Sequence, residues 1–253
     1  METGAITQYV DVAQIVLYLF WAFFAGLIYY LARENHREGY PMDPGRENGP
    51  QITGWPVPEA KTFKLDDGRE FSAPDFNRPD GSYSAQPAHR FNGAPLEPVG
   101  DPLLAGVGPG AWAARADIPD MDPHGHPKIV PMRVATDHSV AKQDVDPRGL
   151  PVWGADKVVA GTVVELWVDR MEMLFRYAEV QLAGSDQRVL LPMTFARIKK
   201  DGTHVQAILG HQFANVPETK SDAQITLLEE EKITAYYGAG TLYATPERQE
   251  PII

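Results

Sequence analysis

The chain has 253 residues, of which 43% are hydrophobic and 23% are charged, and its formal net charge is -11. A chain of this length can bury a substantial core, either as one large domain or as two small ones. The acidic balance argues against nucleic acid as a partner, because nucleic-acid binding depends on clustered Lys and Arg that neutralise phosphates. The sequence contains no cysteine, which excludes disulfides, thiolate metal sites and cysteine nucleophiles.

An apolar segment from residue 12 to residue 32 predicts a single transmembrane α-helix. It reads VAQIVLYLFWAFFAGLIYYLA, close to the ~20 residues that a helix needs to cross about 30 Å of hydrocarbon. Tyr29 and Tyr30 stand where aromatic rings anchor a helix at the membrane interface. A cleaved signal peptide is one alternative, but it would have a basic segment before a shorter apolar run and small residues after it. A buried core helix is the other, and it would need a large domain around it.

Flanking charge predicts the orientation of this helix. Residues 1–11 contain no Lys or Arg, whereas Arg33, Arg37 and Arg46 follow the apolar segment. Positively charged residues gather on the cytoplasmic side of a membrane span. We therefore expect residues 1–11 to be periplasmic and the C-terminal part of the chain to be cytoplasmic.

Residues 33–110 predict an extended segment that lies along partner proteins. Its many prolines and glycines disfavour long helices and central strands. A disordered linker is the alternative, but a solvated linker would keep fewer apolar side chains than this segment has. Those that we expect to anchor it are Trp55, Phe63, Leu65, Phe71 and Phe76.

Residues 111–253 predict a mainly-β domain. Between residues 158 and 209, short β-branched and aromatic runs alternate with turn residues such as Gly184-Ser185-Asp186 and Asp201-Gly202. Strands at this spacing are typical of a small antiparallel barrel. The fold class that we expect is therefore one transmembrane α-helix, a mainly-β cytoplasmic domain and a C-terminal helix.

The C-terminal helix is predicted at about residues 226–243. Thr226 and Glu229 have the spacing of a capping box. The run from Glu229 to Glu231 is interpreted as stabilising the positive amino-terminal end of this helix. Gly238 and Gly240 weaken the helix, so they mark either a close contact with a neighbouring surface or a break.

Several segments resemble the H subunit of the photosynthetic reaction centre of purple bacteria. They read FWAFFAGLIYYLARENHREGYPM, AKTFKL, GVGPGAW, DPRGLPV, GTVVELWVDR and ITLLEEEKITAYYGAGTLYATPER. Together they extend over nearly the whole chain, and the barrel region is also similar to the wider PRC-barrel group. The resemblance implies a subunit without its own catalytic centre that caps the cytoplasmic face of the L and M subunits. Such a subunit shields the quinone sites from water and conducts protons to the secondary quinone.

The same resemblance implies the surroundings of the chain. The membrane would be the bacterial inner, intracytoplasmic photosynthetic membrane. The complex would carry bacteriochlorophyll, bacteriopheophytin, quinones, non-haem iron and carotenoid, none of them bound mainly by this chain. A cytochrome subunit, the light-harvesting antenna and membrane lipids are further expected partners. The alternative function is a membrane-tethered PRC-barrel adaptor or assembly protein, while an enzyme is disfavoured because no nucleophile elbow, phosphate loop or HExxH motif is present.

A first candidate site for proton transfer is the loop with Asp122, His124 and His126. Histidine titrates near neutral pH, so two imidazoles beside a carboxylate can collect protons at a surface. The resemblance implies proton uptake at these residues and binding of divalent transition metals there, and His-x-His with a carboxylate suits zinc-like ions. The alternative is an ordinary solvated loop.

A second candidate site is the segment WVDRMEMLFRY, with Asp169, Glu172 and Arg176. The resemblance places Glu172 at an internal carboxylate near the secondary quinone, with Asp169 and Arg176 in the same polar network. A carboxylate there can relay protons and adjust the stability of the reduced quinone. The alternative is a turn on which three charges pair in solvent. Many relatives have proline where this chain has Met171, so we expect the turn to differ in detail.

Overall fold

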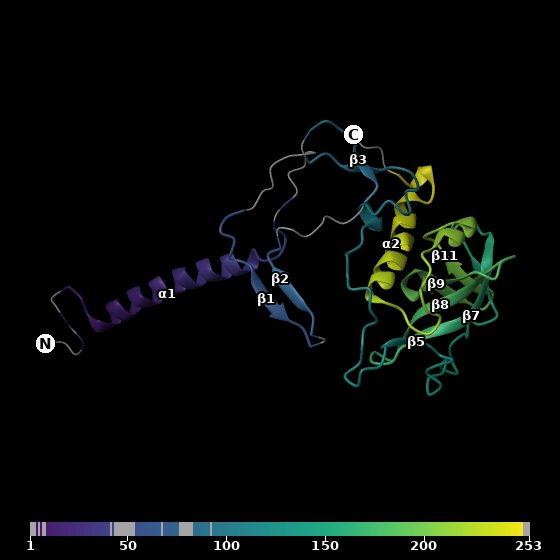
Figure 1. The fold of residues 1–253 in the computed structure, drawn as a ribbon, viewed down its shortest axis with the longest axis horizontal. Helices are drawn as coiled ribbons and strands as arrows, with labels where there is room; N and C mark the ends of the chain where they lie inside the picture. Colours follow the sequence, from purple (N-terminus) through teal and green to yellow (C-terminus); the bar gives the residue numbers. More distant parts are fainter. Residues whose placement is uncertain are drawn as a thin grey trace. The chain divides into compact units, whose positions relative to one another are not determined.

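The chain divides into two compact units in the computed structural model (Figure 1). The first comprises residues 1–80 with 91–93, and the second comprises residues 81–90 with 94–253. The structure describes residues 4, 6, 9–40, 42, 54–66, 68–75, 83–91 and 93–249. Arg46 and Phe76, which entered the expectations above, lie outside these described residues.

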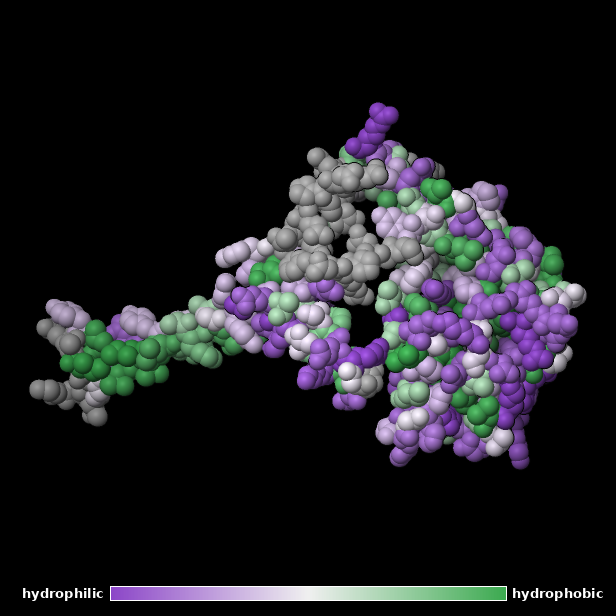
Figure 2. Space-filling model, in the orientation of Figure 1, coloured by the Kyte–Doolittle hydropathy of each residue, from purple (hydrophilic) through white to green (hydrophobic). Residues whose placement is uncertain are grey.

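The first unit begins with helix α1, Val12–Asn35, which has 24 residues. Its length of about 36 Å at 1.5 Å per residue exceeds the ~30 Å hydrocarbon layer. The Asp11 carboxylate caps it by accepting the Gln14 backbone N–H at 2.7 Å. No side chain of α1 is buried within the chain, and Figure 2 shows the hydrophobic surface that results. Within the described part of the chain, α1 is the one helix long and apolar enough to cross a membrane.

Arg37 joins the end of α1 to a short hairpin in the same unit. The hairpin pairs β1, Lys61–Lys64, with β2, Glu70–Ala73, in antiparallel register. The Arg37 guanidinium pairs with Glu34 at 2.8 Å. It also donates to the backbone carbonyls of Glu59 at 2.8 Å and Ala73 at 3.0 Å. Arg37 therefore holds part of the expected extended segment against the helix end.

The second unit is built on a seven-stranded sheet. Its order is β10-β11-β6-β7-β8-β9, and β5 pairs with β7 outside this path. All pairs are antiparallel except β11 with β6, which is parallel. The strands are β5 Ile129–Pro131, β6 Pro151–Trp153, β7 Val159–Asp169, β8 Leu174–Leu182, β9 Arg188–Pro192, β10 Ala196–Lys199 and β11 Gly202–Val205.

This sheet confirms the expected mainly-β domain and adds two strands to it. Strands β7 to β11 fall in the region 158–209 where the alternating pattern predicted them, with the turns at Gly184 and Gly202. Strands β5 and β6 lie before that region and are only three residues long. A separate short hairpin pairs β3, Ala85–Pro87, with β4, Leu96–Pro98.

Helix α2, Leu227–Tyr243, packs closely on the rest of the second unit. Thr226 and Glu229 form the predicted capping box. The glycines of α2 mark close contact, because a Cβ at Gly238 would lie 2.5 Å from the Pro109 carbonyl oxygen, in the turn of 3-10 helix η1, Gly108–Gly110. A Cβ at Gly240 would lie 2.4 Å from the Ile208 side chain. The remaining 3-10 helices are η2 Met193–Phe195, η3 Gly210–Asn215 and η4 Pro246–Arg248.

Candidate functional site

A polar pocket at the turn between β7 and β8 brings charged residues from six segments together. Its volume is about 230 Å³. Apolar side chains of Ile129, Met171 and Leu227 complete its wall. The charged residues that line it are Arg115, Asp120, Lys128, Asp169, Glu172, Arg176 and Glu230. The second group of residues predicted from the sequence, Asp169, Glu172 and Arg176, therefore lies in one place.

Asp169 fixes the shape of the β7–β8 turn. Its side chain is buried at the end of β7, and its Oδ1 accepts the backbone N–H of Met171 at 2.9 Å and of Glu172 at 3.0 Å. Its Oδ2 lies 3.5 Å from the Arg176 Nε on β8. Met173 completes the turn with a left-handed φ of 58°. Asp169 is thus a positioning residue, with one carboxylate oxygen directed at the turn and the other at Arg176.

Glu172 is presented by this turn at the edge of the pocket. Its side chain is 55% exposed, and its Oε2 lies 3.6 Å from the Arg176 guanidinium. A half-exposed carboxylate beside a half-exposed arginine gains little from ion pairing. Arg176 lies between Asp169 and Glu172 as a shared cation.

A hairpin connects the pocket to the first group of predicted residues. Met121 bridges to Pro127, and the Lys128 N–H donates to the Asp120 carbonyl at 2.8 Å. At the base of this hairpin, Lys128 Nζ lies 2.7 Å from Asp120 Oδ2, and the chain continues into β5, where Ile129 pairs with Asp169 on β7. The tip of the hairpin carries Asp122, His124 and His126, so one continuous piece of chain links the two candidate sites.

Asp120 and Lys128 form a tight pair inside the pocket. The hydrogen bond to Asp120 raises the pKa of Lys128, although burial acts in the opposite direction. The negative charges of Asp169 and Glu172 raise the pKa of this lysine further. Lys128 is therefore a permanent cation that stabilises ionised carboxylates around it, rather than a group that releases protons near neutral pH.

Asp122 organises the loop that carries the two histidines. Its Oδ1 accepts the backbone N–H groups of His124 and His126, both at 2.8 Å. Its Oδ2 lies 3.4 Å from the His126 Nδ1. The bond from the His126 N–H is the main cause of the lowered pKa of Asp122, with a smaller contribution from the His124 N–H. Asp122 stays ionised and holds an exposed imidazole beside it, which suits a surface group that collects protons.

The expected metal site at this loop stays a prediction. Asp122 and His126 lie side by side, and imidazole with carboxylate is a suitable donor set for zinc. Nevertheless, no cluster of three or more His, Asp or Glu side chains in the described ranges is arranged to hold a metal ion. Bringing the His124 imidazole to the same ion would require a side-chain rearrangement on this exposed loop.

A separate buried carboxylate, Glu179 on β8, serves the sheet and not the pocket. It accepts hydrogen bonds at 3.0 Å from the Trp167 indole N–H, from Arg133 and from Arg188. Burial disfavours its ionised form, but these three donors outweigh that effect and lower the pKa of Glu179. This network had not been predicted, because its members are far apart in sequence.

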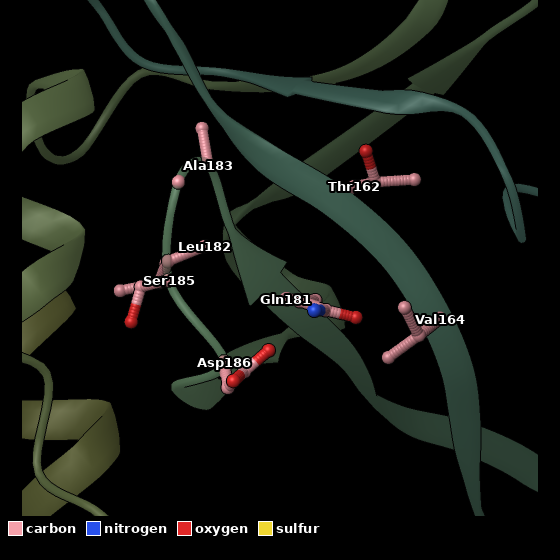
Figure 3. A pocket seen from close by; sticks show the side chains of 8 residues that line it. Thr162, Val164, Gln181, Leu182, Ala183, Ser185 and Asp186 are labelled. Atoms are coloured by element: carbon pink, nitrogen blue, oxygen red, sulfur yellow. The ribbon is translucent and has the colours of Figure 1, made fainter.

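The pocket in Figure 3 lies at the other end of β7 and β8 and has a different character. Its volume is about 540 Å³, and it is lined by Thr162, Gln181 and the turn that ends in Asp186. Thr162 pairs with Gln181 in the sheet, whereas the Asp169 end of β7 pairs with the start of β8. Of the residues lining this pocket, Asp186 alone is titratable, so it has no relay of proton-exchanging groups.

Sequence reasoning missed four charged residues of the polar pocket: Arg115, Asp120, Lys128 and Glu230. Asp120 and Lys128 lie at equal distances in sequence on either side of the histidine loop. A prediction of a hairpin at this loop would have paired them. The capping interpretation holds for Glu229, whose Oε2 accepts the Thr226 N–H at 2.8 Å. The capping interpretation is incomplete for Glu230. Successive residues of a helix point about 100° apart, so Glu230 points away from the helix end and lines the pocket.

Comparison with known families gives two matches. The model of the family described as photosynthetic reaction centre, H-chain N-terminal region, matches residues 4–134. The model of the PRC-barrel domain matches residues 140–212. The first match includes α1, the hairpin with the histidine loop and β5, and the second includes strands β6 to β11. The two matches together contain every candidate residue above except Glu230.

Proposed function

Since this chain belongs to the photosynthetic reaction-centre H-chain family, we propose that it caps the cytoplasmic face of the L and M subunits, shields the quinone sites from water and conducts protons to the secondary quinone. As an H chain it is a single-pass structural subunit that associates with L and M in a reaction centre. The pigments, quinones, non-haem iron and carotenoid of the complex are proposed to be held by its partners.

The observation that carries the proton-conducting role is the polar pocket with four carboxylates and three cations. A path for protons through protein needs titratable groups in succession from solvent inward. The histidine loop supplies the outer group, the Asp120 and Lys128 pair stands at the base of the same hairpin, and Glu172 stands at the pocket edge. The hairpin that joins them supports the proposal that they form one route.

Each residue has a separate role in this route. His126, whose imidazole lies 3.4 Å from Asp122, takes up the proton at the surface. Glu172 receives a proton on a carboxylate oxygen and releases it toward the quinone, and Arg176 lies 3.6 Å from that carboxylate. Asp169 holds the turn in place by accepting hydrogen bonds from two backbone N–H groups of the turn.

We further propose the placement of the chain in the membrane. The absence of Lys and Arg from residues 1–11 and the arginines that follow α1 support a periplasmic amino terminus and a cytoplasmic second unit. Residues 33–110 are proposed to lie along L and M, and residues 111–253 to form the cytoplasmic domain. The membrane is proposed to be the intracytoplasmic photosynthetic membrane of a bacterium.

Replacing Glu172 by Gln tests the function in the intact reaction centre. The substitution keeps the size of the side chain and removes its proton exchange. We expect proton-coupled transfer of the second electron to the secondary quinone to slow by about tenfold or more, with unchanged initial charge separation. Asp186→Asn, in the pocket at the far end of the same strands, is the matched control. Equal quinol formation in both variants would count against the assigned role.

An absorption spectrum of the natively purified complex distinguishes the proposal from a membrane-tethered adaptor. A reaction-centre subunit purifies with near-infrared pigment bands, whereas an adaptor or assembly protein also occurs in colourless complexes. If every native assembly that contains this chain is colourless, the proposed function is wrong.

A further inference from the structure

Glu230 lines the polar pocket from the first turn of α2. The Tyr177 hydroxyl, on β8, donates a hydrogen bond of 3.0 Å to Glu230 Oε2. Tyr177 itself is buried, at 4% exposure. The neighbouring carboxylates of α2 are engaged elsewhere, since Glu229 caps the helix and Glu231 lies 3.6 Å from Arg115. Glu230 is thus the one acid of this run that faces the pocket.

The geometry of this pair assigns the two oxygens of Glu230 different tasks. Burial, together with the negative charge of Glu230, raises the pKa of the Tyr177 hydroxyl. The hydroxyl therefore keeps its proton and donates it to Oε2. Oε1, which the tyrosine leaves free, is the oxygen that is open to a proton taken up by Glu230.

Burial is also the main influence on Glu230, and it raises the pKa of this carboxyl. The hydrogen bond from Tyr177 and the positive charges of Arg176 and Arg115 act in the opposite direction, while Asp120 adds to the increase. A carboxyl whose pKa is raised holds its proton to higher pH than an exposed glutamate, closer to the pH at which quinone is reduced.

We propose that Glu230 is a second proton-holding carboxyl of the route. It takes a proton on Oε1 and passes it to Glu172 after Glu172 has given up its own proton. This inference rests on the proposed function and extends it inward by one residue. The transfer moves one proton between two carboxyl groups, and no other bond is made or broken. Arg176 couples the two, since it lies 3.6 Å from Glu172 and its charge also acts on Glu230.

The charged and titratable groups that face Glu230 come from every element around it. Strand β8 contributes Arg176, in the pocket wall, and Tyr177, through its hydrogen bond. The segment before the histidine hairpin contributes Arg115. The remaining groups are Asp120 and Lys128 on the hairpin, Asp169 at the end of β7 and Glu172 in the turn. Their formal charges nearly cancel, so the raised proton affinity of Glu230 depends on its burial rather than on one neighbour.

The experiment compares intact reaction centres that carry Glu230→Gln, Tyr177→Phe or the control Glu231→Gln. Light-induced infrared difference spectra report the carbonyl stretch of protonated carboxyl groups, and a pH indicator reports proton uptake when the secondary quinone is reduced. We expect Glu230→Gln to lose one protonation signal. We expect Tyr177→Phe to move the pH midpoint of that signal upward by about one unit, because the ionised form loses a hydrogen bond.

The outcomes separate this inference from the proposed function. If Glu172→Gln slows the second electron transfer while Glu230→Gln keeps the full infrared signal and proton uptake, Glu230 is not a proton-holding group and the proposed function stands. If Tyr177→Phe leaves the midpoint unchanged or lowers it, the assigned role of the tyrosine is wrong. Should Glu230→Gln fail to assemble, the shift in Tyr177→Phe decides the question. A loss of signal in Glu231→Gln as well would overturn the assignment to Glu230.

Discussion

Replacing Asp169 by Ala or by Asn distinguishes the hydrogen bonds that this residue accepts in the turn from the negative charge that it carries. Its Oδ1 accepts two backbone N–H groups, and hydrogen bonds to a charged group contribute about 1.5–3 kcal/mol each. Because the turn is partly open to solvent, we take the lower end and expect Asp169→Ala to destabilise the turn by about 3 kcal/mol. Asp169→Asn keeps one side-chain oxygen that can accept both backbone N–H groups. It loses the ion pair with Arg176 at 3.5 Å, which lowers the stability of the turn by about 1 kcal/mol.

Two measurements on the intact reaction centre check this expectation. The first is the rate of second-electron transfer, which should fall more in Asp169→Ala than in Asp169→Asn because only the former releases Glu172 from its position. The second is the pH profile of this rate, which a purely structural loss would not move. If Asn and Ala have the same effect on rate and profile, the two N–H bonds are not what positions Glu172.

Two further predictions concern other carboxylates and the histidine loop. The pKa of Glu179 is lowered in the folded chain, so the stability that its carboxylate contributes is present above the ordinary pKa of 4.5 and is lost as the pH falls through the lowered value. Glu179→Gln should therefore lower the free energy of unfolding by about 2 kcal/mol at pH 7 and flatten its dependence on acid pH. Urea unfolding of the full chain in detergent measures both effects. Identical pH slopes would contradict it. Replacing His124 and His126 together by Ala should raise the zinc concentration that half-inhibits proton uptake by about tenfold or more, equivalent to about 1.4 kcal/mol; equal inhibition would place the metal site elsewhere.

The elements that the sequence predicts well are those with a strong local pattern. The apolar run of α1 and the alternating runs of β7 to β9 define their own structure, and Thr226 with Glu229 marks the start of α2. Strands β5 and β6 have three residues each and contain proline, so no periodicity can develop in them. Their pairing, including the parallel contact of β6 with β11, depends on tertiary packing.

The sequence predicts the separate groups of residues in the candidate site, but not the tertiary contacts that bring these groups together. Asp169, Glu172 and Arg176 are close in sequence and come together through a single turn. The connection to His126 depends on the pairing of Ile129 with Asp169, which joins segments 40 residues apart. Glu230 was assigned to the helix end, because a run of three acids at an amino terminus has an adequate explanation without tertiary contacts.

Met171 helps to hold the turn that presents Glu172. Its N–H donates to Asp169 at 2.9 Å, a bond that proline at this position cannot make. Proline instead restricts φ and so stiffens the turn before folding. This chain lacks that restriction and also places Met173 at a left-handed φ of 58°, which costs about 1 kcal/mol or more. The turn that presents Glu172 therefore depends on Asp169, whose Oδ1 accepts the backbone N–H groups of both Met171 and Glu172.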